Sequence, residues 1–313
     1  MKLKNILFSL IMLVSMLFIG TANAETTAPS SYVIDGSKLH TTYGVNYLSG
    51  SQYLNIQFKK TTDGKVVYCI ERSKAPIGSS TKEKYVLQKE LSAKVAYVME
   101  NGYPNKSIFG DADKDYYTTG LAIWYVINPS DSTFDYFNLA NGTYRGNSSD
   151  VVKAMAKLVN GANSYSYTSP SIKINNSNSN LVLSSDGKYY VSSSMSVKTT
   201  GTVGNYTVSL SNAPEGTIVT DTKGTAKTTF ATNESFLVKV PVSSVKNLSN
   251  EFKVNVSAKG TINKAYAYTS TRSNVQNTGA LYPENSNVND STTVKLNVVT
   301  VVEISKVDVT TGE

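Results

Sequence analysis

The chain has one cysteine, one histidine and one tryptophan among its 313 residues. A single cysteine cannot form a disulfide within its own chain, so Cys69 is buried, pairs with another chain or takes part in chemistry. One cysteine and one histidine also cannot supply the four ligands of a structural zinc site. The sequence holds no phosphate-binding glycine loop and no serine elbow. We therefore expect no metal and no cofactor.

Long apolar runs are confined to the amino terminus. A basic start and an apolar run from Ile6 to Gly20 precede the small-residue cleavage site Ala22-Asn23-Ala24. This order of segments predicts an export signal over residues 1–24. No second apolar stretch of roughly 18 residues follows. We therefore expect a secreted protein that does not insert into a membrane once the signal is removed.

Positive charge is modest and is carried mostly by lysine. The formal net charge is +7, and the arginines are Arg72, Arg145 and Arg272. No run of basic residues is interleaved with aromatic ones, as a nucleic-acid surface would require. We therefore expect no nucleic-acid partner.

A change in composition near Ser169 predicts two domains after the signal, at 25–168 and 169–300. Before this point apolar residues recur at helical spacing, whereas after it short alternating runs predict an almost wholly β, sandwich-like subdomain. The fold class expected is therefore α+β. Helices are expected at Leu91 to Asn101, Tyr117 to Ile127 and Asp150 to Val159, with Gly161 just past the end of the third. Strands are expected at Tyr53 to Phe58, Lys65 to Ile70, Leu181 to Leu183, Tyr189 to Val191, Tyr206 to Leu210, Phe236 to Val240, Phe252 to Val256 and Ala265 to Tyr268.

Residues with acid, base or metal chemistry do not form a recognisable set. His40 lies near the mature amino terminus, where an exposed strand-edge position is favoured over a catalytic Cys-His pair. The segment from Asp111 to Asp115 imitates the start of a calcium loop, but Tyr116 and Ala122 stand where that loop needs glycine and glutamate. We interpret it as an acidic turn leading into a helix. The chain is not expected to be an enzyme.

Two separated motifs carry a family resemblance. Tyr68-Cys69-Ile70 lies in a predicted strand, and Thr118-Thr119-Gly120-Leu121-Ala122-Ile123-Trp124-Tyr125 lies in a predicted helix. In this order they resemble the thioester domains of Gram-positive surface adhesins, in which a Tyr-Cys-Ile type strand precedes a helix with Thr-Gln-x-Ala-Ile-Trp. The resemblance covers most of Ser31 to Leu158. Residues 169–300 resemble the β-rich subdomain that accompanies such domains, and 301–313 resembles the first strand of a collagen-adhesin B-type stalk domain.

The resemblance implies a reaction and a set of residues for it. The cysteine sulfur attacks a glutamine side-chain amide, ammonia leaves, and the resulting thioester is captured by an amine. Cys69 would be the nucleophile, and position 120 would carry the acyl group. Tyr68, Thr119, Trp124 and Tyr125 would line the site, the aromatic rings shielding the thioester from water. Position 120 is glycine here, so the bond is not expected between these two positions.

Other glutamines are alternatives for the acyl donor. The glutamines of the chain are Gln52, Gln57, Gln88 and Gln276, and of these Gln57 and Gln88 are the candidate partners for Cys69. Gln276 lies in the predicted β-rich half. Without a partner glutamine, Cys69 is interpreted as a buried small hydrophobe and Trp124 as a core residue.

Two functions are consistent with these observations. The first is the monomeric head of a longer surface adhesin, secreted and attached to the cell wall or pilus of a Gram-positive bacterium. It would bind lysine amines of host-surface proteins covalently if a glutamine at position 120 were restored. The second is a non-covalent binding or stalk module with a buried free cysteine. Loss of one ammonia mass and an amine adduct in Gly120→Gln would separate the two.

Overall fold

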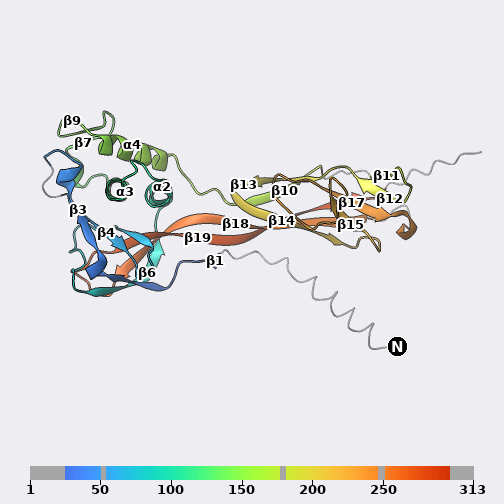
Figure 1. The fold of residues 1–313 in the computed structure, drawn as a ribbon, viewed down its shortest axis with the longest axis horizontal. Coiled ribbons are helices and arrows are strands. Elements are labelled where there is room, and N and C mark those ends of the chain that lie inside the picture. The colour runs from blue at the N-terminus through green and yellow to red at the C-terminus, as the bar shows by residue number, and fades with distance from the viewer. Residues whose placement is uncertain (1–24, 51–53, 177–180, 246–250, 297–313) are drawn as a thin grey trace, which may run out of the picture. The chain divides into compact units, whose positions relative to one another are not determined.

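The computed structural model describes residues 25–50, 54–176, 181–245 and 251–296 (Figure 1). The predicted export signal, Gln52 and the predicted stalk strand at 301–313 lie outside these residues. The described chain forms two compact units. A helical unit comprises residues 25–169 and 261–285, and a β unit comprises residues 170–260 and 286–296. None of the described helices is long and apolar enough to cross a membrane.

The division differs in one respect from the boundary expected at 168. Residues 261–285, placed in the β-rich half by the sequence, belong to the helical unit. The cause is the length of two strands, β18 (Glu251–Ser270) and β19 (Thr278–Lys295), which are hydrogen-bonded neighbours and contribute residues to both units. The composition change near Ser169 lies at the start of the β unit, but the sequence does not predict that residues 261–285 return to the helical unit.

The helical unit is built on one curved sheet. Its strands are hydrogen-bonded in the order β2-β6-β18-β19-β5-β4-β3, with β1 added to β19. Their bounds are β1 Glu25–Thr26, β2 Ser31–Asp35, β3 His40–Thr42, β4 Ile56–Lys60, β5 Val66–Cys69 and β6 Lys82–Glu90. A small sheet of β7 (Phe137–Asn138), β8 (Thr143–Tyr144) and β9 (Asn147–Ser148) lies apart from it. Short 3-10 turns occur at Gly36–Lys38, Gly44–Asn46 and Ser132–Phe134.

Three helices pack together in the same unit: α2 (Ala93–Asn101), α3 (Ala112–Ile127) and α4 (Asp150–Asn163). Helix α3 is buried from Asp115 to Trp124 and contacts both other helices and the strands β4 and β5. It starts five residues earlier than expected, because the Asp111 carboxylate caps it by accepting from the amides of Asp113 and Lys114. The fold is α+β, as the sequence predicts.

Helix α4 continues through Gly161, where the sequence predicts an end. The glycine is used for close packing. A Cβ atom at this position would lie 2.2 Å from the Tyr97 hydroxyl oxygen on α2. The missing side chain therefore lets two helices approach each other, and the helix runs on to Asn163.

The β unit contains strands and a 3-10 turn at Val242–Ser244 in its described residues. Strand β10 (Ser171–Asn175) pairs with β13 (Ser196–Thr200), and β18 pairs with β14 (Thr202–Ser211), which pairs with β16 (Thr229–Phe230). A further sheet has the order β11-β12-β17-β15, with bounds Leu181–Leu183, Tyr189–Ser192, Phe236–Pro241 and Ile218–Asp221. The β unit has a core of its own, which includes the buried side chains of Tyr206, Phe236 and Val254.

Candidate functional site

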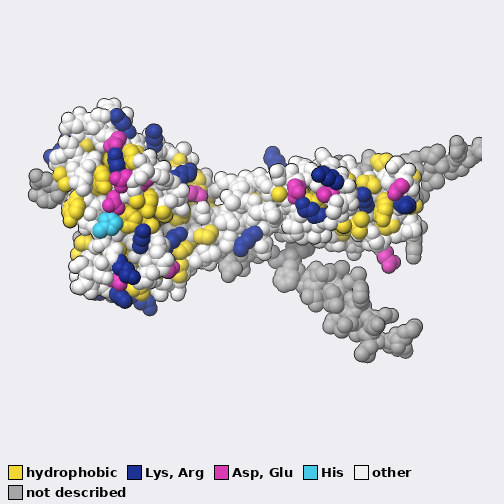
Figure 2. Space-filling model, viewed as in Figure 1, with side chains coloured by type: hydrophobic (Ala, Val, Ile, Leu, Met, Phe, Trp, Pro, Cys, Tyr) yellow, Lys and Arg dark blue, Asp and Glu magenta, His cyan; other side chains and the backbone are white. Residues whose placement is uncertain are grey.

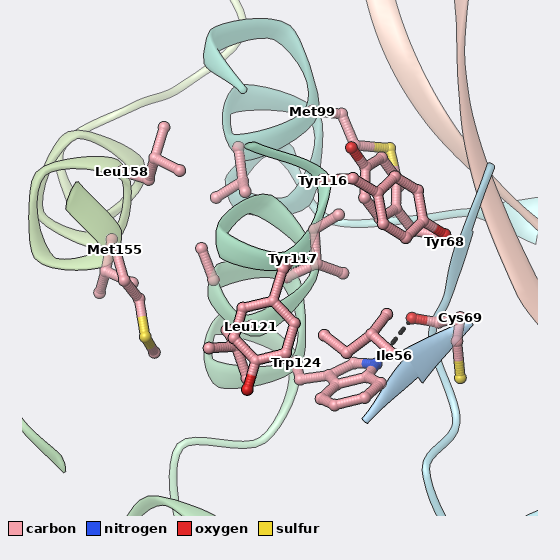
Figure 3. Packing of buried hydrophobic residues seen from close by; sticks show 14 of the residues in the cluster. Ile56, Tyr68, Cys69, Met99, Tyr116, Tyr117, Leu121, Trp124, Met155 and Leu158 are labelled. Atoms are coloured by element: carbon pink, nitrogen blue, oxygen red, sulfur yellow. Dashed lines mark hydrogen bonds between the residues drawn. The ribbon is translucent and has the colours of Figure 1, made fainter. Parts of the chain in front are cut away.

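Cys69 ends strand β5, in which all four residues are buried. Its side chain and that of Tyr68 leave the strand on opposite sides (Figure 3). Tyr68 stacks on Tyr116 of α3 at 4.5 Å, whereas the Cys69 sulfur points away from this ring pair. The indole N–H of Trp124 donates to the Cys69 carbonyl oxygen at 2.8 Å. Helix α3 thus holds the backbone of Cys69, while the Cys69 sulfur points away from the rings of Tyr68 and Tyr116.

Gly120 does not face this sulfur. A Cβ atom at position 120 would lie 3.1 Å from Ile56 Cδ1 and 3.8 Å from Tyr68 Cδ1, on the side of β5 that Tyr68 occupies. The space opposite Gly120 is therefore filled by the sheet. The expectation that Cys69 would face a place vacated at position 120 is wrong, because successive residues of a strand point to opposite faces.

The other residues expected to line the site are separated in the same way. Thr119 is fully buried, donates to the Asp115 carbonyl oxygen and accepts from the Tyr103 amide. Tyr125 packs edge-on against Phe134 at 5.1 Å. Neither of these residues, nor Tyr68, lines the cavity beside the sulfur, whereas Cys69 and Trp124 do.

That cavity, of about 260 Å³, brings Cys69 together with a glutamine that the sequence placed in the other domain. Gln276 precedes β19, and the pairing of β19 with β5 sets Thr278 opposite Cys69. Gln276 lies two residues before Thr278 and is therefore close to the end of β5. Gln276 and Cys69 both line this cavity.

The backbone of Gln276 is held on both sides. Its amide donates to the Ala75 carbonyl oxygen at 2.9 Å, and its carbonyl oxygen accepts from the Tyr85 hydroxyl at 3.2 Å. One residue later, the Asn277 carbonyl oxygen accepts from the Ile70 amide at 3.0 Å. These bonds fix the glutamine against the end of β5.

A second glutamine, Gln57 on β4, lines the same cavity. Its Nε2 donates to the Ile77 carbonyl oxygen at 3.0 Å, and its Oε1 is buried with no hydrogen-bond partner among the described residues. Gln88 lies on β6 and does not line the cavity. Of the two alternatives favoured by the sequence, the structure places Gln57 beside Cys69 and Gln88 away from it.

Lys59 is the unexpected residue of the site. It is 1% exposed, and no carboxylate among the described residues pairs with it. Its Nζ donates to Gln276 Oε1 at 3.3 Å and to the Gln57 carbonyl oxygen at 3.5 Å. Burial lowers the pKa of Lys59 because it disfavours the charged amine. Burial raises the pKa of the Cys69 thiol, and nearby Lys59 opposes that shift.

The remaining charges near the cavity are paired. Arg72 bonds Asp131 at 3.1 Å and lies over the Trp124 ring, and Lys74 bonds Glu71 at 3.0 Å. Figure 2 likewise shows basic and acidic side chains interspersed on the face drawn. Lys59 is thus the cavity cation that faces a neutral amide instead of an acid.

The acidic segment at the start of α3 has a structural role. Asp115 is 1% exposed and accepts from Ser107, Ile108 and Phe109, so it is not part of a solvated acidic turn. Asp113 pairs with the exposed His40 at 2.8 Å. No set of three or more potential metal ligands gathers in the part of the chain that the structure describes.

The arrangement suits acyl transfer. Residues with a thiol and a carboxamide line one cavity, and an amine donates to the carboxamide oxygen, where charge would develop during attack. From the sequence, Gln276 is named but set aside in the β-rich half, and Lys59 is not identified, because no local motif marks either residue as part of the site. The signal that would have located Gln276 is the pairing of β19 with β5, which is a long-range contact.

Comparisons with known proteins agree with this fold. Residues 66–164 match the family model of the thioester domain. The structure of the Bacillus anthracis TIE protein is similar over 88% of this chain and 48% of its own, with 23% identity and a TM-score of 0.60. The thioester domain of the Enterococcus faecium TIE86 protein is similar over 88% of this chain and 99% of its own, with 19% identity and a TM-score of 0.57.

The chain spans about half the length of the Bacillus anthracis protein. No protein of curated function matches the sequence. The matched segment contains Cys69 and all three helices, and the described fold extends it through β18 and β19. Residues 66–164 of this chain thus match the thioester-domain family model, and the fold of the chain is similar to that of two solved thioester-domain proteins.

Proposed function

We propose that this chain is the head of a bacterial surface adhesin that binds amines covalently through a thioester between Cys69 and Gln276. The observation that carries the proposal is the shared cavity of the buried thiol and the Gln276 carboxamide. The glycine at position 120 does not exclude this thioester, because position 120 does not face the Cys69 sulfur.

The reaction balances without a cofactor. The Cys69 sulfur attacks Gln276 Cδ and forms a C–S bond, the C–N bond breaks, and the amide nitrogen leaves as ammonia with the thiol proton. A lysine amine of a partner protein then attacks the same carbon, forms an isopeptide bond and releases the thiol. Because the product is covalent, attachment no longer depends on an ordinary dissociation rate.

Gln276 is favoured over Gln57 as the acyl donor. Its Oε1 accepts from Lys59, which draws electrons from the carbon to be attacked. The Gln57 nitrogen is instead held by the Ile77 carbonyl oxygen, and its free Oε1 offers an acceptor to the N–H of an entering amine.

A labelled amine tests the proposal. Incubation with a fluorescent primary amine is expected to label the wild-type chain and Gln57→Ala, with peptide mapping placing the label on Gln276. Cys69→Ala and Gln276→Ala are expected to remain unlabelled while melting cooperatively. Labelling that survives in folded Cys69→Ala would contradict the proposal.

The alternative is a non-covalent binding or spacer module. Its support is that Cys69 is 2% exposed and packs with core residues, as an inert buried cysteine does. The same experiment separates the two functions, because a spacer module would take up no amine at Gln276. We further propose that the head is secreted, belongs to a Gram-positive cell surface and is not an enzyme that turns over.

A further inference from the structure

We propose that Lys59 is a catalytic residue for the acyl transfer: its amine donates to Gln276 Oε1 and stabilises the charge that this oxygen takes up when sulfur or amine attacks. The inference rests on the proposed thioester and extends it to the group that activates the bond. It starts from an anomaly, a lysine that is 1% exposed without an acidic partner among the described residues.

Stability does not account for a lysine at this position. Burying an amine in an apolar core is costly, and proteins normally pair such a group with a carboxylate. Position 59 shares its face of β4 with Gln57, which also lines the cavity, whereas the alternating positions Ile56 and Phe58 pack into the core cluster around the helices. The polar groups that Lys59 does contact are the Gln57 carbonyl oxygen and the oxygen of the reacting amide.

Hydrogen bonds fix the backbone of Lys59, and its side chain lines the cavity. The Tyr116 hydroxyl accepts from the Lys59 amide at 3.2 Å and donates to the Val67 carbonyl oxygen at 2.8 Å. Strand β4 also pairs Lys59 with Val67 on β5, two residues before Cys69. Lys59 and Cys69 are therefore carried on adjacent strands and meet Gln276 in one cavity.

The same contact serves both steps. In thioester formation, attack of sulfur on Gln276 Cδ moves an electron pair onto Oε1, and its return expels ammonia with the thiol proton. In capture, attack of an amine on the same carbon again charges Oε1, and its return expels the sulfur, which regains a proton from the amine. A donor aimed at Oε1 lowers both barriers.

Ring closure can be timed in one experiment. Excess ammonia reopens the thioester to the Gln276 amide and the free thiol, and its removal by desalting lets the bond form again. Intact mass then follows the loss of ammonia with time. Removing an oxyanion donor slows such reactions about 100- to 1000-fold, so Lys59→Met is expected to close that much more slowly than wild type.

Matched variants separate catalysis from structure. Lys60→Met changes the adjacent exposed lysine and is expected to close at the wild-type rate. Lys59→Gln keeps an N–H donor and is expected to close faster than Lys59→Met. The melting temperature of Lys59→Met is expected to equal or exceed that of wild type, since an unpaired buried amine is removed.

Four results would overturn the inference. Closure of Lys59→Met at the wild-type rate would remove Lys59 from the reaction and leave the thioester proposal standing. Failure of both Lys59 variants to fold would make the side chain structural. A peptide cross-linked between Lys59 and Gln276, with an alkylatable Cys69, would make Lys59 the acceptor of the acyl group. A wild-type chain that never loses ammonia would remove the thioester itself and this inference with it.

Discussion

Gly120 lies where helix α3 comes closest to strand β4. A Cβ atom there would lie 3.1 Å from Ile56 Cδ1, which is tighter than normal side-chain contact, and a longer side chain would press further into the sheet. Glycine in a helix interior costs about 1 kcal/mol relative to alanine. At this position the cost is offset by close packing of helix and sheet.

We predict that Gly120→Gln destabilises the fold and makes no second thioester. Overpacking costs about 1–3 kcal/mol, which exceeds the helix propensity regained. Urea unfolding measures the loss, and Ile56→Val, which removes the opposing methyl group, is expected to relieve part of it in the double variant. Loss of ammonia in Gly120→Gln combined with Gln276→Ala would show that position 120 can carry the acyl group after all.

Single residues were predictable where a local rule applies. Ser149 caps α4 by accepting from the Val152 amide, which is the role that serine commonly takes at a helix start. Trp124 and Cys69 are correctly brought together, because their motifs lie on elements that pack directly. The expectation that position 120 faces Cys69 is wrong, because a resemblance gives a residue's place in a motif but not the direction in which its side chain would point.

At the scale of elements, the connection between β18 and β19 carries Gln276. It is anchored at its start by Glu83 of β6, which is 2% exposed and accepts from Ser270 and from Arg272. Burial by itself would raise the pKa of Glu83, but these hydrogen bonds outweigh it and hold the pKa below 4.5. The anchor therefore depends on an ionised carboxylate.

We predict that this anchor gives the fold an acid-sensitive contribution. Because the pKa is lower in the folded state, the stabilisation is present above pH 4.5 and is lost as pH falls through the folded-state value. Glu83→Gln is expected to lower the free energy of unfolding by about 1–3 kcal/mol at neutral pH, with a difference that shrinks as the pH falls below 4.5. Glu90→Gln, in an exposed ion pair, is the control. A difference that stays constant with pH would contradict the account.

Helices were more predictable than the long strands. The three helices carry apolar stripes and capping signals in the local sequence. Two separate runs, Phe252 to Val256 and Ala265 to Tyr268, instead belong to the single strand β18. Strand β19 was missed because it contains Pro283 and a polar stretch, and its pairing is set by strands distant in sequence.

For the molecule as a whole, the helical unit is discontinuous in sequence. Strand β6 pairs with Tyr266–Ser270 of β18, β5 pairs with the start of β19, and Ala265 and Leu281 complete the core around the helices. The segment matched by the family model, 66–164, contains the cysteine but not the glutamine. A domain boundary inferred from composition alone therefore separates the two reactive groups.

We predict that residues 25–169 alone do not form the functional unit. Without β18 and β19 the fragment loses the partners of β5 and β6 and exposes their apolar faces. Circular dichroism during heating is expected to show no cooperative transition, in contrast to residues 25–296. A fragment that melts cooperatively and is labelled by an amine would contradict this prediction.

The intact mass of the freshly purified, folded protein tests the central claim most directly. The account predicts that wild type and Gln57→Ala are lighter than their sequences by one ammonia and resist thiol alkylation, whereas Gln276→Ala has its full mass and an alkylatable Cys69 once unfolded. A wild-type chain at full mass, with Cys69 alkylated as readily as in Gln276→Ala under the same unfolding conditions, would contradict it.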